Sequence, residues 1–414
     1  MKRILIDGRF VGVGESVSRY TLEVLSRIIK LDKENKYTLL IRPCGADVFA
    51  EFFKIPAYES GIMDFESQKN YEKLKQEKLI ENCKSKYKNL ELSILDVKHY
   101  SPKEQTKLLK YLKQEKFDLV HFTQFNHPVF YKGAFAVTVH DLTMLGHLHR
   151  QNPIKRIAFN KVMKAAAINS AKIITVSETS KNDILDYYDI PKDKIVVTYL
   201  GTDSKYNISV RGQQSKIDQF MKKYDIGDQY ILYTGMWKRH KNLLRALEAF
   251  EKAAQKGEVA NRKIQFVMAG KMDKKEPEVI QKIENINKSL GRKAVVTTGF
   301  VLEEELPLAY AGALAYIIPS LSEGFGLPPL EAMACGTPVI SSKESCMPEI
   351  LGDVPLYFDP YDIDDMAKAM EKIITDKELR QKMIPKGLEQ VRRYSWDDTA
   401  QKTLEVYKEV LKLC

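Results

Sequence analysis

Short apolar runs rich in β-branched and aromatic residues alternate with helix-length segments along the whole chain of 414 residues. The runs are almost continuously apolar, which is typical of strands buried on both faces of a parallel sheet. Their alternation with helices predicts doubly wound α/β domains. The expected strands are residues 3–7, 37–41, 92–95, 119–122, 136–140, 172–176 and 194–200, then 230–235, 264–270, 294–300, 315–319, 338–342 and 355–358.

This alternation resets once, in the polar, glycine-bearing stretch 201–229, after which a new strand begins. The length of the chain also exceeds what one ordinary core organises. We therefore predict two Rossmann-like domains, residues 1–205 and 206–395, that face each other across a cleft. Ligands of such domains bind at the carboxyl ends of the strands, so the functional residues should gather there.

The net charge of +10 is unevenly spread, because residues 69–116 hold 13 Lys against 7 Asp and Glu. This segment is interpreted either as a solvated helix face or as a surface for anionic lipid headgroups or an anionic acceptor. Nucleic acid is disfavoured as a partner, since no zinc-finger spacing or RNA-binding signature is found. No apolar run reaches the ~18 residues of a membrane helix, and no signal peptide is recognised. We expect a cytoplasmic protein, either free or peripheral at the inner face of the membrane, with its five scattered cysteines as free thiols.

The stretch SEGFGLPPLEAMACGTPVI, residues 322–340, predicts a loop followed by a helix. Pro328 and Pro329 suit the first turn of that helix, and Gly336 suits the position just past its end. Glu323 then lies in the loop after a buried strand, and Glu331 lies within or near the first helical turn.

The amides around Phe325, Gly326 and Leu327 should point out of the helix N-terminus, where they can bind an anion. Two carboxylates beside an anion site suit a sugar nucleotide, in which hydroxyl-rich ends flank a diphosphate. The simpler interpretation is that Glu331 only favours a helix N-terminus and that Glu323 is solvated.

The sequence EGFGLPPLE with AMACGTPVI resembles the E-x7-E signature of the retaining glycosyltransferases of family 4 (glycosyl transferases group 1), which have the GT-B fold. The resemblance covers nearly the whole chain. RILIDGRFVGVGESVSRYTLEVL, AVTVHDLTML, IITVSETSKNDIL, YTGMWKRHKNL and GFVLEEELPLAYAGALAYIIPS follow in the expected order. The ending YSWDDTAQKTLEVYKEVL resembles the last helices of the fold, so residues 396–414 are expected to cross back to the first domain.

The resemblance implies a role for each matching residue of the second domain. Glu331 would bind the ribose of the donor nucleotide, and Glu323 would bind the donor sugar and its developing positive charge. Lys241 would neutralise the diphosphate leaving group. The family often has an arginine where this chain has His240 or Met236, which leaves open whether Arg239 or His240 supplies the second phosphate contact.

Further site residues follow from the same resemblance. His140 would lie beside the donor sugar and the acceptor hydroxyl, next to Asp141 on the acceptor side. The glycine loop with Gly12 and Gly14 would approach the acceptor and the donor diphosphate. Gly299 and Phe300 would contact the nucleotide base through backbone groups. Taken singly, these residues could equally be turn glycines, a packed histidine and a capping carboxylate.

The resemblance implies a hexosyltransferase that moves mannose or glucose from a GDP- or UDP-linked donor to a glycan or lipid-linked acceptor in cell-surface polysaccharide or glycoconjugate synthesis. Neither a cofactor nor a metal is expected; His147 and His149 lack further ligands nearby in sequence and are interpreted as surface residues. Two alternatives stay open. One is a non-catalytic sugar-nucleotide-binding subunit of a transferase complex, and the other is a sugar-nucleotide 2-epimerase of related fold.

Overall fold

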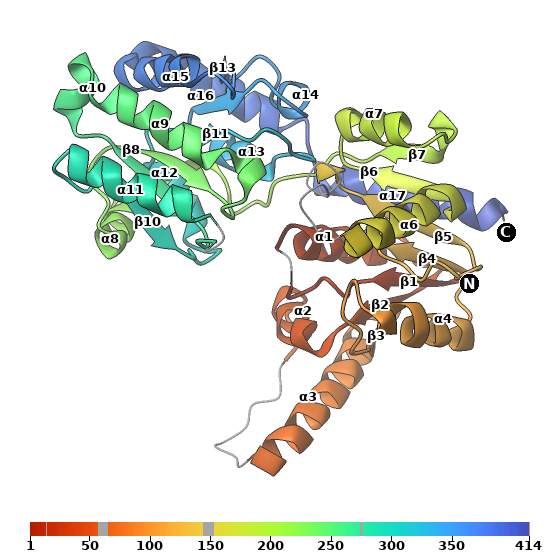
Figure 1. Ribbon diagram of the computed structural model, residues 1–414. Coiled ribbons are helices and arrows are strands. Elements are labelled where there is room, and N and C mark those ends of the chain that lie inside the picture. Colours follow the sequence, from red (N-terminus) through yellow and green to blue (C-terminus); the bar gives the residue numbers. More distant parts are fainter. Residues whose placement is uncertain (14, 57–64, 144–152, 274–275, 414) are drawn as a thin grey trace. The chain divides into compact units, whose positions relative to one another are not determined.

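The computed structural model describes residues 1–13, 15–56, 65–143, 153–273 and 276–413 (Figure 1). It divides into two compact units. Unit 1 comprises Met1–Leu200 together with Trp396–Cys414, and unit 2 comprises Gly201–Ser395. Each unit is built on its own parallel sheet, which gives the expected pair of α/β domains.

The sheet of unit 1 has seven strands in the order β3-β2-β1-β4-β5-β6-β7. All neighbouring pairs are parallel. The strands are β1 (Arg3–Asp7), β2 (Lys36–Ile41), β3 (Leu90–Ile94), β4 (Leu119–Phe122), β5 (Phe135–Val139), β6 (Lys172–Thr175) and β7 (Ile195–Val197). The α-helices are α1 (Glu15–Leu31), α2 (Ala46–Phe52), α3 (Phe65–Lys86), α4 (Leu109–Glu115), α6 (Pro153–Asn169), α7 (Glu178–Tyr187) and α17 (Trp396–Leu413).

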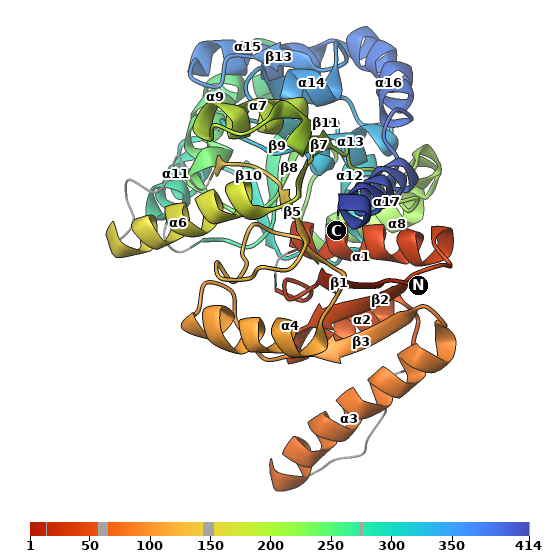
Figure 2. The same cartoon turned by 90° about the vertical axis from the view of Figure 1, so that its right-hand side faces the viewer.

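The strand β4 shows why both faces of this sheet are covered. Val120 and Phe122 point into an apolar cluster that also contains residues of α4, α6 and α7. His121, between them, points to the opposite face and bonds to Tyr407 of α17 through Nδ1, at 2.6 Å. Its Nε2 lies 2.7 Å from the hydroxyl of Thr138. The last helix of the chain is therefore part of the core of unit 1, packed beside α1 (Figure 2).

The sheet of unit 2 has six parallel strands in the order β10-β9-β8-β11-β12-β13. They are β8 (Tyr230–Thr234), β9 (Gln265–Ala269), β10 (Val295–Gly299), β11 (Ala315–Ile318), β12 (Val339–Ser342) and β13 (Leu356–Phe358). The helices are α8 (Gln214–Tyr224), α9 (Leu243–Ala254), α10 (Gly257–Arg262), α11 (Pro277–Ser289), α12 (Leu306–Gly312), α13 (Leu327–Ala334), α14 (Met347–Leu351), α15 (Ile363–Thr375) and α16 (Lys377–Val391). On one side α9 packs against α10, α11 and α15, and elsewhere α13 packs against α12 and α16.

Every strand predicted from an apolar run is present, with ends that differ by a few residues at most. Near-continuous burial explains this agreement, because a strand covered on both faces is apolar at most of its positions. In each sheet the strand order reverses once, between β1 and β4 in unit 1 and between β8 and β11 in unit 2. Loops on either side of such a reversal diverge and leave room for a ligand at the carboxyl ends of the strands.

The lysine-rich segment 69–116 is not one continuous helix. It includes most of α3, then β3, then the π-helical turn η2 (Glu104–Leu108) and α4. Several of its lysines have acidic partners: Lys75 lies 2.7 Å from Asp47, and Lys78 lies 3.3 Å from Glu81. Within the described ranges, no helix combines the length and the apolar character needed to cross a membrane.

Candidate functional site

The candidate site of unit 2 forms where β8 and β11 end side by side, at the reversal of strand order. After β8 the chain turns at Gly235 and enters the short 3-10 helix η6 (Arg239–Lys241). Asn242 follows in the left-handed conformation, with φ of 56°, and α9 begins at Leu243. Asn242 is buried and donates its side-chain amide to the carbonyl of Pro360, at 2.7 Å. These contacts fix the backbone that carries Lys241.

Lys241 and Glu323 form a largely buried ion pair. Nζ of Lys241 lies 2.6 Å from Oε1 of Glu323, and the two side chains are 22% and 13% exposed. Burial, the largest single cause, would raise the pKa of Glu323. The charge and hydrogen bond of Lys241, together with smaller effects of Ser320 and His240, outweigh it and hold that pKa below the ordinary value. Ser345 fixes the backbone of Glu323, since its hydroxyl accepts from the amide at 3.0 Å and donates to the carbonyl at 2.8 Å.

The helix α13 begins directly after this carboxylate. Its N-cap is Gly326, with φ of 83°, where an added Cβ would lie 2.5 Å from the Met347 side chain. Pro328 and Pro329 occupy the first turn as predicted, but they carry no N–H. This helix start therefore offers fewer free amides to an anion than a usual helix N-terminus does. Only Leu327 has an N–H group among the first three helical residues.

The Phe325 side chain points into the interior of unit 2. It is buried and packs edge-on against Tyr394, with ring centroids 5.5 Å apart. Only the backbone of Phe325 remains to contact a ligand.

Glu331 is buried, with 4% exposure, and lies in the second turn of α13 rather than the first. The Tyr310 hydroxyl donates to its Oε2 at 2.9 Å. The same hydroxyl lies 2.9 Å from that of Thr234, which is also 3.3 Å from the Tyr316 hydroxyl. This hydroxyl network under Glu331 was not predicted. Nothing in local sequence patterns marks it, because its members come from β8, α12, β11 and α13.

The remaining predicted residues of unit 2 lie at the same edge of the sheet. Arg239 is exposed, whereas His240 is half-buried and accepts the Leu321 amide at its carbonyl, at 2.7 Å. The Arg239 side chain is therefore the more accessible of the two. Gly299 ends β10 with φ of 69°, and Phe300 after it is 61% exposed.

In unit 1, His140 and Asp141 follow the carboxyl end of β5. His140 Nε2 lies 3.0 Å from the carbonyl of Thr123 and must carry the proton, since a carbonyl only accepts. Burial lowers the pKa of His140, so its imidazole is neutral. Asp141 accepts from the Thr143 amide at 2.9 Å, which is the capping role of the simpler interpretation.

The glycine loop after β1 is described in part. Gly12 has φ of 76°, and an added Cβ would lie 2.6 Å from the carbonyl oxygen of Cys44, so this position requires glycine. Gly14, His147 and His149 lie outside the described residues. Among the residues that are described, no group of three or more His, Cys, Asp or Glu side chains is placed to hold a metal ion.

Two family profiles match the chain. Glycosyl transferases group 1 matches residues 216–390, and Glycosyltransferase Family 4 matches residues 88–206. The O-antigen chain mannosyltransferase B of Escherichia coli is 29% identical over 275 residues, which cover 66% of this chain and 70% of that protein. The serotype-specific mannosyltransferase WbdA of Escherichia coli is 28% identical over 58% of this chain, but the match spans only 29% of WbdA.

Solved structures show the same fold at low sequence identity. Sucrose-phosphate synthase from Thermosynechococcus elongatus matches with a TM-score of 0.69 and 17% identity over 100% of both chains. Anabaena HepE, solved in complex with UDP and glucose, matches with a TM-score of 0.69 and 15% identity, over 99% of this chain and 100% of that one. The two α/β domains therefore have the GT-B fold.

Proposed function

The chain belongs to the glycosyltransferases of family 4, and we propose that it is a retaining, metal-independent hexosyltransferase that transfers mannose from a nucleotide-linked donor. The acceptor would be a growing polysaccharide. The mannose assignment is supported by the names of the relatives, which are mannosyltransferases of O-antigen chains. The observation that carries the proposal is the ion pair between Lys241 and Glu323 at the adjoining ends of β8 and β11.

This pair supplies the two charges that the reaction needs. As the bond from the anomeric carbon to the diphosphate oxygen breaks, negative charge grows on the phosphate and positive charge on the sugar ring. Lys241 has three N–H donors and can meet the phosphate while it stays bonded to Glu323. Glu323 remains ionised because its pKa is lowered, so it can accept from sugar hydroxyls and stabilise the ring.

The acceptor oxygen would form its new bond to the anomeric carbon on the face that the diphosphate leaves. Its proton would pass to an oxygen of the departing phosphate, so no side-chain base is required. Glu331 would hold the ribose hydroxyls, supported from beneath by Tyr310. The amides of Gly326 and Leu327 and the exposed Arg239 would meet the phosphates.

The test is to incubate the protein with GDP-mannose or UDP-glucose and an α-mannobiose acceptor, without added divalent metal and with EDTA present. With GDP-mannose we expect release of GDP and an α-linked mannosyl product, identified from its anomeric proton signal. A β-linked product would refute retention, and activity that is lost in EDTA would refute metal independence. Conversion of the donor without acceptor would favour an epimerase. Donor binding without turnover would favour a non-catalytic subunit.

A further inference from the structure

We propose that unit 1 holds a subsite for a neutral sugar ring of the acceptor, and that Tyr100 is the surface on which this ring stacks. The inference rests on the proposed function, because it assigns the acceptor of that reaction. Tyr100 is 57% exposed, although the polar residues around it, Arg9, Glu104 and Asn126, are buried.

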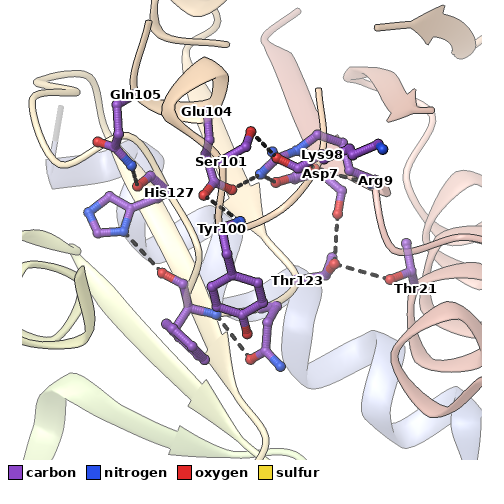
Figure 3. Close-up of polar contacts among 12 residues, drawn as sticks. Asp7, Arg9, Thr21, Lys98, Tyr100, Ser101, Glu104, Gln105, Thr123 and His127 are labelled. Atoms are coloured by element: carbon purple, nitrogen blue, oxygen red, sulfur yellow. Dashed lines mark hydrogen bonds and ion pairs between the residues drawn. The ribbon is translucent and has the colours of Figure 1, made fainter. Parts of the chain in front are cut away.

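Four loops at the carboxyl edge of the sheet meet around Tyr100. Tyr100 itself follows β3, and the buried Arg9 follows β1. Asn126 follows β4, and Asp141 follows β5. Figure 3 shows the Tyr100 amide at the Glu104 carboxylate, with the Tyr100 ring directed away from the charged cluster. The residue thus lies at the reversal of strand order between β1 and β4, where a ligand is expected.

A buried charge network holds the backbone of Tyr100 in place. Arg9 is fully buried and donates to both carboxylate oxygens of Asp7, at 2.8 and 2.7 Å. Its Nη2 also donates to Oε1 of the buried Glu104, at 2.9 Å. The other oxygen of Glu104 accepts from the Tyr100 amide at 3.2 Å. This chain of contacts links β1 to the π-helical turn η2, a type of turn that is frequent at functional sites.

The backbone of Tyr100 is strained. Its φ is 55°, in the left-handed region that bulky side chains rarely adopt. Lys116 has a similar φ of 50°, but it is the C-cap of α4, where this conformation is common. Tyr100 caps no helix, so helix capping does not account for its left-handed conformation. The chain has a tyrosine at this position, although glycine would adopt the same conformation without strain. Strain of this kind gathers at binding sites, where the surrounding structure sustains it.

The polar groups beside the ring suit hydroxyls rather than an anion. Although most of the residue is exposed, its phenol is enclosed enough that burial, then the carboxylates of Glu104 and Asp141, raise its pKa to about 12. Asn126 hydrogen-bonds the phenol and is 2% exposed, yet its Oδ1 has no partner among the described residues. An aromatic face, the Asp141 carboxylate and a spare amide oxygen match the C–H face and hydroxyl donors of a neutral hexose. A carboxylated or phosphorylated sugar would be repelled.

The backbone strain supplies a sharp test, the substitution Tyr100→Gly. Glycine removes the ring and relieves the strain, so the melting temperature should stay equal or rise. The KM for α-mannobiose should rise by about tenfold, the effect of losing one stacked ring face. The KM for GDP-mannose should not rise with it. Lys116→Gly is the matched control, because it makes the same backbone change away from the site. Tyr100→Phe, which keeps the ring, should restore most of the lost affinity.

Binding can be measured without turnover, by saturation-transfer NMR with methyl α-mannopyranoside and methyl α-glucuronopyranoside as probes. We expect transfer to the neutral sugar in the native protein and its loss in Y100G. An unchanged acceptor KM in Y100G, or equal binding of the glucuronide, would overturn the inference. If the protein transfers no sugar yet binds methyl α-mannopyranoside through Tyr100, the proposed function fails and the subsite stands. If transfer is normal in Y100G, only the subsite fails.

Discussion

Nζ of Lys241 and Oε1 of Glu323 lie 2.6 Å apart, although the two residues are 82 positions apart in the chain. They meet because β8 and β11 are neighbours in the sheet and each residue lies in the loop that follows its strand. A cation and an anion thus lie side by side at the place where the proposed reaction would develop negative charge on the phosphate and positive charge on the sugar ring.

Replacing Lys241 with methionine should damage both stability and catalysis. The change leaves Glu323 as an unpaired, largely buried carboxylate, so the free energy of unfolding should fall by about 2 kcal/mol. Turnover should fall by about 10²–10³-fold, because growing charge on the leaving group loses its counter-ion. Thermal unfolding and product formation measure the two effects.

The neighbouring Lys238→Met is the matched control. Lys238 also pairs with a carboxylate, Asp273 at 2.7 Å, but its side chain is 46% exposed and such pairs contribute little. In the double variant K241M/E323Q the stability loss should be smaller than the sum of the single losses. Strict additivity would show that the pair does not act as a unit.

Tyr310→Phe should weaken binding of the nucleoside diphosphate by severalfold. The variant removes the hydroxyl that donates to Glu331, so this carboxylate loses its orientation and one hydrogen bond, worth about 1 kcal/mol. Calorimetric titration with GDP and UDP measures the change. Tyr316→Phe is the control, because its hydroxyl bonds to Thr234. Equal weakening by both variants would argue against a specific role of Glu331.

Unit 1 should lose stability as the pH falls below 6.5. Burial, the largest cause in each case, lowers the pKa of His99 and His121 to about 3 and of His127 to about 4. In the unfolded chain these histidines bind protons with the ordinary histidine pKa of about 6.5, whereas in the folded protein they stay neutral at that pH. Their stability contribution is therefore complete above 6.5 and declines toward the folded pKa values, by about 1.4 kcal/mol per histidine per pH unit.

The two tryptophans allow each unit to be followed separately, since Trp396 belongs to unit 1 and Trp237 to unit 2. In W237F the remaining fluorescence reports unit 1, and in W396F it reports unit 2. The unit 1 signal should show the steeper fall in melting temperature between pH 6.5 and 5, because His240 is the one histidine in the sequence of unit 2. Equal falls in the melting temperatures of the two units would contradict the proposal that the buried histidines of unit 1 cause the loss of stability.

Tyr407→Phe should loosen helix α17 from the sheet of unit 1. It leaves Nδ1 of the fully buried His121 without its partner at 2.6 Å, which should cost about 1–3 kcal/mol. The Trp396 signal measured in W237F reports this loss directly, because Trp396 starts the same helix. Tyr187→Phe on α7 provides the control, since that residue is 60% exposed. An unchanged unfolding temperature in Y407F would show that α17 is held by apolar packing alone.

Much of the fold could be predicted from the sequence because its signals are local. An apolar run bounded by turns marks a strand buried on both faces, and Pro328, Pro329 and Gly336 mark the two ends of α13. The E-x7-E spacing likewise placed Glu323 and Glu331 around one helix start. The same sequence patterns could not show that the two prolines leave this start with few free amides.

Tertiary structure alone decided which distant groups meet. Lys241 reaches Glu323 only because β8 and β11 pair, and Tyr310 reaches Glu331 only because α12 packs against α13. The backbone of the left-handed Tyr100 is held by Glu104. Glu104 is in turn held by Arg9, which is 95 residues away in the chain. Periodicity and turn chemistry report on neighbours within a few residues, whereas the partner of a side chain depends on strand order and helix packing. The sequence by itself thus determined the elements and the identity of the charged groups, and packing determined their partners.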